Sequence, residues 1–316
     1  MKHKGKEIKN YRVLADGLRG LEGPVALADG SVLVCEMAEG RVTRVMPDGS
    51  KVVAAVTGGT PDGLALGPDG KCYVCNRGSS RWRQIGDLLL PVQEDEPNDP
   101  EARGYIQRFD LDTGKVEMLY EAAGELGLTG PNDLVFDAQG GFWFTDFGRM
   151  RPRNVDRGSV FYAKADGSLI REVMGPFMGP NGIGLSPDGN WLYVAESFTH
   201  HLYKFEIAGP GEIKRSPSPF PEHGGYFVGG PDGMAFFDSL ALDSAGYVVV
   251  ATPGAGILTV FHPRNGAYQK IPMPDMAPTN LCFGGKNLKT AYVTLLATGR
   301  LAAFDWPRPG LRLNYQ

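Results

Sequence analysis

The feature that most constrains the fold of this chain is an internal repeat. Each copy consists of a polar residue, a short apolar strand, a tight turn and a second apolar strand. Two examples are EGPVALADGSVLVCE from Glu22 and DGLALGPDGKCYVCN from Asp62. Self-similarity of this kind is the signature of repeat architectures. We therefore expect one supersecondary unit built several times, in place of two unrelated domains.

Six copies can be traced, about 52 residues apart on average. A third strand follows each copy, as in GYIQRFDL and HLYKFEI, and in most copies a more variable fourth segment comes next. Four-stranded units repeated radially describe a β-propeller. A stacked solenoid would need capping repeats, and the sequence shows none. The copies begin at Glu22, Asp62, Asn132, Asn181, Asp238 and Asn280.

Composition and turn chemistry agree with an all-β fold. The 44 Gly and 24 Pro residues disfavour a helical protein, and a hydrophobic content of 42% excludes a disordered one. We expect residues 1–316 to form a single six-bladed β-propeller domain with four strands per blade. The last copy lacks a fourth strand after GRLAAFDW, whereas YRVLADGL at residues 11–18 has the right pattern. This N-terminal strand is predicted to close the last blade, which protects the strand edges.

Two insertions interrupt the regular spacing, at residues 79–103 and 220–237. Long irregular loops in compact domains often cover binding sites, so both are candidate lid loops; a passive surface excursion is the alternative. Aromatic residues in them, Trp82 and Tyr226, would cover the site, and Tyr226 is a candidate for substrate contact.

The net charge and the cysteine content restrict the classes of binding partner and the cellular compartment that we expect. The net charge of −4 gives no basic field, so we expect no nucleic acid and no anionic membrane as partner. The chain has no apolar run of about 18 residues and no apolar signal segment at its start. Cys72 and Cys75 have a spacing that puts them on opposite faces of a strand, which favours buried thiols over a metal or redox pair. We expect a reduced, cytoplasmic protein, and the sequence gives no indication of its oligomeric state.

The polar residues that begin the copies are the candidate site. In the first five copies this residue lies eight positions before the turn glycine or its equivalent, as Glu22 does before Gly30, and this register selects Asp238 over Asp232. Because the first strand of each blade lines the channel, six such positions converge on the axis. All six carry oxygen and none is His or Cys, which suits Ca²⁺, or less tightly Mg²⁺ or Mn²⁺, better than Zn²⁺. Alternatively, these residues only satisfy turn backbones.

Several motifs resemble the regucalcin/gluconolactonase family of lactonases. They are LEGPVAL, GPNDLVFD with FWFTDFG, GPNGIGLSPDG with YVAES, and FDSLALDSAG, in the expected order over nearly the whole chain. The resemblance implies a six-bladed propeller with one divalent cation in its channel, commonly Ca²⁺, with Mg²⁺, Mn²⁺ or Zn²⁺ as alternatives. It also implies that Asn132 and Asp133 belong to the substrate site, Asp133 from behind the ligands. Some sugar lactonases carry Arg where this chain has Gly130. The metal ligands that it implies are Glu22, Asn132, Asn181 and Asp238.

The function expected from these residues is metal-dependent hydrolysis of a lactone or similar small ester. The cation would act as a Lewis acid on the carbonyl oxygen, and Asp238 would be the catalytic base toward water. Asn132, Asp133 and Tyr226 would bind the substrate. Two alternatives stay open: phosphotriesterase-like or strictosidine-synthase-like chemistry on the same fold, and a non-enzymatic propeller that binds Ca²⁺ or a protein.

Overall fold

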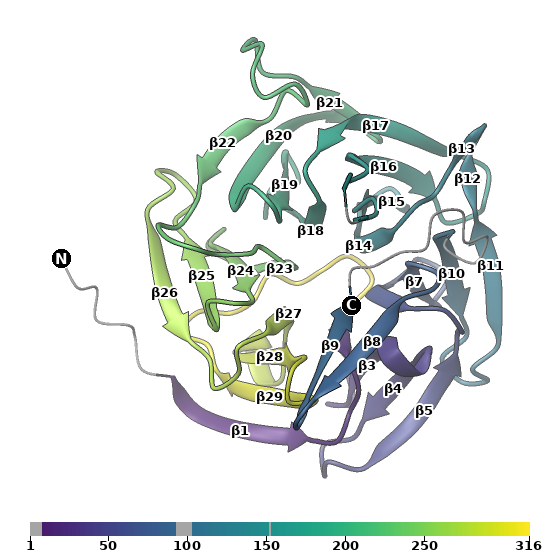
Figure 1. Ribbon diagram of the computed structural model, residues 1–316, viewed down its shortest axis with the longest axis vertical. Helices are drawn as coiled ribbons and strands as arrows, with labels where there is room; N and C mark the ends of the chain where they lie inside the picture. Colours follow the sequence, from purple (N-terminus) through teal and green to yellow (C-terminus); the bar gives the residue numbers. More distant parts are fainter. Residues whose placement is uncertain (1–7, 93–102, 152) are drawn as a thin grey trace.

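The computed structural model describes residues 8–92, 103–151 and 153–316. These residues form six antiparallel sheets arranged as blades around a central channel (Figure 1). The all-β, six-bladed propeller predicted from the repeat is confirmed. The innermost strands of the six blades are β2 (Leu21–Ala26), β6 (Pro61–Leu66), β14 (Pro131–Phe136), β18 (Pro180–Leu185), β23 (Leu240–Leu242) and β27 (Pro278–Gly284).

The second and third strands of each blade carry most of the core. The second strands are buried almost throughout, because neighbouring blades cover both of their faces. These strands are β3 (Val32–Glu36), β7 (Cys72–Asn76), β15 (Gly141–Asp146), β19 (Trp191–Glu196), β24 (Val248–Thr252) and β28 (Thr290–Leu295). The third strands are β4 (Arg41–Val45), β10 (Tyr105–Phe109), β16 (Gly158–Lys164), β20 (His201–Gly209), β25 (Ile257–Phe261) and β29 (Arg300–Asp305).

The outer strands complete the blades and are more exposed. They are β5 (Lys51–Val56), β11 (Val116–Tyr120), β17 (Ile170–Phe177), β21 (Glu212–Lys214), β26 (Tyr268–Pro272) and β1 (Lys9–Ala15). The short strands β12 (Ala122–Ala123) and β13 (Leu126–Gly127) lie between the second and third blades along the chain. The 3₁₀ helices η1 (Met37–Glu39) and η3 (Lys286–Leu288) connect strands within the first and the last blade. None of the helices in the described residues is long and apolar enough to cross a membrane.

The core lies between blades and not on the axis. One cluster, for example, joins Leu33 and Val42 of the first blade to Leu64 and Val74 of the second. All four cysteines are buried and form no disulfide. Cys72 packs in the cluster between the first and second blades, whereas Cys75, on the other face of β7, packs in the cluster between the second and third blades. The prediction of buried structural thiols is confirmed.

Both chain ends secure the ring. Strand β1 pairs antiparallel with β29 as the outer strand of the last blade, which confirms the predicted closure. At the other end of the chain, the last residues cross the lower mouth of the channel, where the inner strands finish. Asn314 Nδ2 donates to the Phe136 carbonyl at 2.9 Å, and Gln316 Nε2 donates to the Phe283 carbonyl at 3.1 Å. The repeat pattern does not predict this second contact.

The two insertions take different places. In the first, strands β8 (Arg81–Ile85) and β9 (Leu88–Val92) form a hairpin that lies over the upper mouth, where the inner strands begin (Figure 1). Trp82 packs with Ala277 and Leu296 of the last blade, so the hairpin reaches across the ring. Residues 93–102 of this insertion lie outside the described part. In the second, β22 (Tyr226–Gly229) pairs with β20 as an extra outer strand of the fourth blade.

Candidate active site in the central channel

The inner strands are irregular at the positions that the repeat singles out. Pairing with the second strand shifts register between Glu22 and Val25 in β2, and the same shift recurs at the start of β6, β14, β18 and β27. A bulge re-aims side chains near a sheet edge. It allows two consecutive residues of one strand to face the channel, and the repeat therefore delivers two layers of side chains to the axis.

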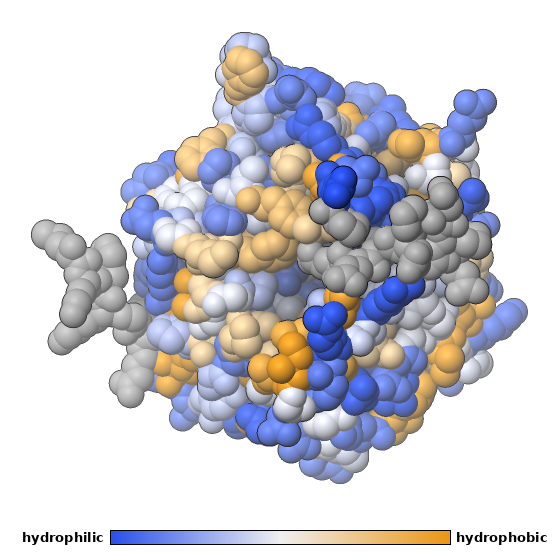
Figure 2. Space-filling model, in the orientation of Figure 1, coloured by the Kyte–Doolittle hydropathy of each residue, from blue (hydrophilic) through white to orange (hydrophobic). Residues whose placement is uncertain are grey.

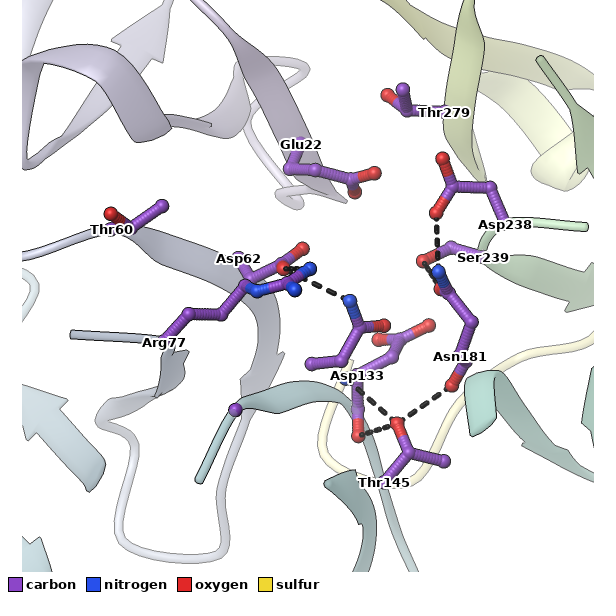
Figure 3. A network of polar contacts seen from close by, with 12 residues as sticks. Glu22, Thr60, Asp62, Arg77, Asp133, Thr145, Asn181, Asp238, Ser239 and Thr279 are labelled. Carbon is purple, nitrogen blue, oxygen red and sulfur yellow. Dashed lines mark hydrogen bonds and ion pairs between the residues drawn. The ribbon is translucent and has the colours of Figure 1, made fainter. Parts of the chain in front are cut away.

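The upper layer lines a cavity of about 130 Å³ at the mouth of the channel. The residue directly after each upper-layer residue belongs to the layer below, which holds three glycines. A Cβ on Gly63 would lie 2.6 Å from the Asn132 carbonyl oxygen, and one on Gly182 would lie 2.5 Å from the Leu240 nitrogen. The glycines therefore let neighbouring inner strands approach closely. The upper layer consists of Glu22, Asp62, Asn132, Asn181, Asp238 and Thr279 (Figure 3).

The sixth member of the upper layer is Thr279, so the assignment of Asn280 to the ring is wrong by one residue. Asn280 occupies the layer below and makes the same main-chain contacts there as Asp133, although its side-chain amide also reaches Glu22. The Asn280 N–H donates to Thr294 Oγ1 at 2.9 Å, as the Asp133 N–H donates to Thr145 Oγ1 at 3.1 Å. The sixth copy lacks the eight-residue spacing to a turn glycine, so its register could not be fixed from the repeat.

Three asparagine amides hold the three carboxylates, and one of them, Asn280 Nδ2, donates to Glu22 Oε2 at 2.8 Å from the layer below. Asn132 Nδ2 donates to Asp62 Oδ2 at 3.0 Å, and Asn181 Nδ2 donates to Asp238 Oδ1 at 2.7 Å. Each amide is thereby oriented by its nitrogen. Within the described ranges, Asn132 Oδ1 is the only buried side-chain nitrogen or oxygen without a hydrogen-bond partner. A buried oxygen without a hydrogen-bond partner lowers the stability of the fold, and a cation bound to it would remove this loss.

The carboxylates of Glu22, Asp62 and Asp238 point toward one another across the channel (Figure 3). Burial raises the pKa of Asp62 to about 7, which Arg77 and Asn132 partly oppose, and it raises the pKa of Asp238 to about 8. The pKa of Glu22 lies well above its usual range because of burial and of the negative charges of Asp238 and Asp62. Asp62 and Asp238 therefore retain protons near neutral pH unless a cation compensates their charge, and the pKa of Glu22 is shifted in the same direction.

The donor set fits a hard divalent cation. In the part of the chain that the structure describes, no group of three or more Asp, Glu, His or Cys side chains is arranged to hold a metal by itself. Amide oxygens must therefore complete the site, and the partnerless Asn132 Oδ1 is one that is available. Carboxylate and amide oxygens are the ligands of Ca²⁺ and, with fewer protein ligands, of Mg²⁺.

Above the ring, the cavity wall is mainly apolar. It receives Trp82 and Val92 from the β8–β9 hairpin, and apolar side chains border the hollow at the centre of this face (Figure 2). Its charged residues above the ring are Arg77 and Arg149. The other apolar wall residues are Met37, Pro91, Phe147, Met150, Phe236 and Leu296.

The structure does not bring two of the sequence-predicted residues to this cavity. Asp133 lies in the layer below, where burial raises its pKa to about 7, and its Oδ1 accepts from the Leu134 N–H at 2.9 Å. Tyr226 lies on the outer strand β22, with its ring centre 5.8 Å from that of Trp191. At Tyr226 the insertion forms the outer edge strand of the fourth blade, which places this side chain away from the channel.

Arg77 and Phe147 also line the cavity, and neither is among the residues predicted from the sequence. Each is the residue directly after the second strand of a blade. Arg77 follows β7 and Phe147 follows β15. A signal was available, because the second strand runs antiparallel to the first and so ends at the mouth where the first begins. The residue after each second strand is therefore a wall position.

The comparisons with known proteins agree with this geometry. The family model described as SMP-30/Gluconolactonase/LRE-like region matches residues 20–297. The lactonase drp35 of Staphylococcus haemolyticus (strain JCSC1435) is 28% identical over 265 residues, which cover 83% of this chain and 72% of that protein. The 6-deoxy-6-sulfogluconolactonase of Pseudomonas putida is 31% identical over 184 residues, 57% of this chain and 59% of that protein.

Solved structures show the same fold at low identity. A gluconolactonase from Xanthomonas campestris superposes with a TM-score of 0.72 at 21% identity, covering 97% of this chain and 96% of its own. A calcium-binding regucalcin from Agrobacterium tumefaciens str. C58 gives a TM-score of 0.72 at 18% identity, with coverages of 96% and 98%. At these identities the likeness supports the fold alone.

Proposed function

This chain belongs to the SMP-30/gluconolactonase/LRE-like family, and we propose that it is a divalent-cation-dependent hydrolase that opens a small lactone. The observation that carries the proposal is the convergence of three carboxylates and a partnerless buried amide oxygen on one cavity. The lactonases among its relatives support the reaction class. A cavity of about 130 Å³ is small beside the roughly 300–1,000 Å³ of drug-sized sites, which suits a compact substrate.

The residues that would hold the cation are Glu22, Asn132, Asn181 and Asp238, with Ca²⁺ as the ion that an all-oxygen set favours. When bound, a divalent cation supplies Lewis-acid polarisation of the lactone carbonyl. The asparagines contribute orientation: because Asn132 donates to Asp62 and Asn181 donates to Asp238, both amide planes are fixed before any ligand arrives.

Asp238 is the base in the proposed reaction. Its carboxylate lines the cavity and accepts from Asn181 Nδ2 at 2.7 Å, which leaves its second oxygen for a water molecule. As the water oxygen bonds to the lactone carbonyl carbon, Asp238 takes the water proton. The ring C–O bond then breaks, and the ring oxygen takes that proton to become a hydroxyl, so the product is a hydroxy acid.

The apolar wall and the hairpin serve the same reaction by limiting solvent. Trp82 and Phe236 cover the ring of oxygens from opposite parts of the chain. Excluding bulk water strengthens the electrostatic contacts inside the cavity. This assigns the first insertion a covering role through its β8–β9 hairpin.

The test is a hydrolysis assay with aldonolactones, aryl lactones and simple butyrolactones, in Ca²⁺ and in chelator. Asp238→Asn and Glu22→Gln should each lose at least about a hundredfold in kcat/KM, in line with removing a general base or a metal ligand. Asp232→Asn, the same change at an exposed position on the neighbouring loop, is the matched control. Undiminished activity in both site variants would refute the mechanism. Cation binding without hydrolysis of any lactone would favour the non-enzymatic alternative.

A further inference from the structure

Arg77 is a cavity residue that the reaction proposed above does not use. Its guanidinium carbon lies 4.8 Å from the centre of the Phe147 ring, and its carbonyl oxygen accepts from Arg149 Nη2 at 2.5 Å. Within the described ranges its side chain makes one hydrogen bond, from Nη1 to Asp62 Oδ2, at 3.4 Å. The side chain is 26% exposed, and Figure 3 shows it beside Asp62 at the edge of the ring. It is therefore held in place with most of its hydrogen-bonding capacity unused.

Neutralising Asp62 does not account for this geometry. A guanidinium offers five N–H donors in a fixed planar fork, and a bidentate carboxylate contact has N–O distances near about 2.8 Å. The bond to Asp62 is single and long, while Asn132 already donates to the same carboxylate at 3.0 Å. A planar cation on an aromatic face is restrained in orientation, which lowers the entropy lost when its edge binds a partner.

The charges of the cavity lining also favour an anionic ligand. Glu22, Asp62 and Asp238 are its acidic residues, and Arg77 and Arg149 are its basic ones. With one divalent cation and all five groups ionised, the lining carries one net positive charge, which a monoanionic ligand would balance. The Arg149 guanidinium donates to main-chain carbonyl oxygens, those of Thr129 and Arg77 among them, which leaves Arg77 as the basic side chain with donors available for that ligand.

We propose that Arg77 is a specificity-determining residue that binds an anionic substituent of the substrate, so that the preferred lactone carries a carboxylate beside the ring. The lactone part rests on the function proposed above, whereas the anion contact does not. The mainly apolar wall gives a hydroxyl-rich neutral ring few other partners. A carboxylate on the fork of Arg77 would place the lactone ring over the six oxygens.

The kinetic test compares 5-oxotetrahydrofuran-2-carboxylate with its neutral 5-(hydroxymethyl) analogue. The unmodified protein should favour the carboxylate in kcat/KM by about 10- to 100-fold, the range of a charge-assisted contact. That preference should fall to about one in Arg77→Gln and be partly retained in Arg77→Lys, which keeps the charge near Asp62. Lys214→Gln removes one positive charge from the outer edge of the fourth blade and should keep the preference.

A binding test separates this inference from the proposed function. Calorimetry with tetrahydrofuran-2-carboxylate and tetrahydrofurfuryl alcohol, neither of which can be hydrolysed, measures the anion contact directly in Ca²⁺ and in chelator. The inference is supported if the unmodified protein binds the carboxylate more tightly than the alcohol and folded Arg77→Gln does not. This holds even if no lactone is hydrolysed. Equal binding of the carboxylate by Arg77→Gln and the unmodified protein, or hydrolysis of both lactones at equal rates, overturns it while leaving lactone hydrolysis intact.

Discussion

Replacing Asp62 by Asn should stabilise the metal-free protein at alkaline pH. Asp62 is buried, and the fold raises its pKa from 3.8 to about 7. A carboxyl group whose pKa is raised by folding supports the fold while it is protonated, and this contribution is lost as the pH rises from about 4 to about 7. At about 1.36 kcal/mol for each tenfold change in the ionisation constant, ionised Asp62 costs the fold about 4 kcal/mol at pH 8.

Asp62→Asn removes this cost and keeps an oxygen that can accept from Asn132. The assay is urea unfolding in chelator, followed by tryptophan fluorescence, at pH 4 and pH 8. We expect the variant to exceed the unmodified protein by about 4 kcal/mol at pH 8 and to match it closely at pH 4. Adding Ca²⁺ at pH 8 should shrink the gain, because the cation compensates the negative charge of Asp62, which the variant lacks.

The matched control is Asp48→Asn in an exposed turn. The Asp48 carboxylate accepts from the hydroxyl and N–H of Ser50, which lower its pKa, so its ionised form supports the fold and the variant should gain nothing at pH 8. The cost assigned to burying ionised Asp62 is refuted if Asp62→Asn is no more stable than the unmodified protein at pH 8 in chelator. It is also refuted if the gain is the same at pH 4, since the gain must follow ionisation.

Three further predictions follow from the channel. Asn132→Ala should weaken Ca²⁺ binding by about tenfold or more in calorimetry, whereas Tyr226→Phe should leave it unchanged. Gly63→Ala should lower the free energy of unfolding by about 1–3 kcal/mol, because the new Cβ meets the Asn132 carbonyl; Gly127→Ala, which meets nothing within 4 Å, should not. Ca²⁺ binding at pH 7 should release protons from Asp62, Asp238 and Glu22, so the apparent binding enthalpy should depend on the ionisation enthalpy of the buffer.

The repeat predicted more than the fold, because its register also selected side chains. The spacing to the turn glycine identified Asp238 over Asp232, and the structure places Asp238 in the cavity beside Asn181. The rule worked because the hairpin between the first two strands has a nearly constant length in five copies. It failed for Asn280, where that hairpin differs and Thr279 takes the upper position.

What the sequence could not supply depended on tertiary contacts. The second layer, with Asp133, arises from bulges that leave no composition signal. The placement of Trp82 depends on a hairpin that reaches from the second blade to the last. Tyr226 was assigned to substrate because its segment is long and irregular, yet the main-chain pairing of β22 with β20 fixes it at the blade edge.

A crystal structure of the protein grown with Ca²⁺, with anomalous scattering recorded, tests most directly whether the six oxygens of the channel bind a cation. We expect one peak in the channel, about 2.3–2.6 Å from carboxylate oxygens of Glu22 and Asp238 and from the amide oxygens of Asn132 and Asn181. No peak there, or a peak bound only through residues outside the upper layer, would contradict this expectation.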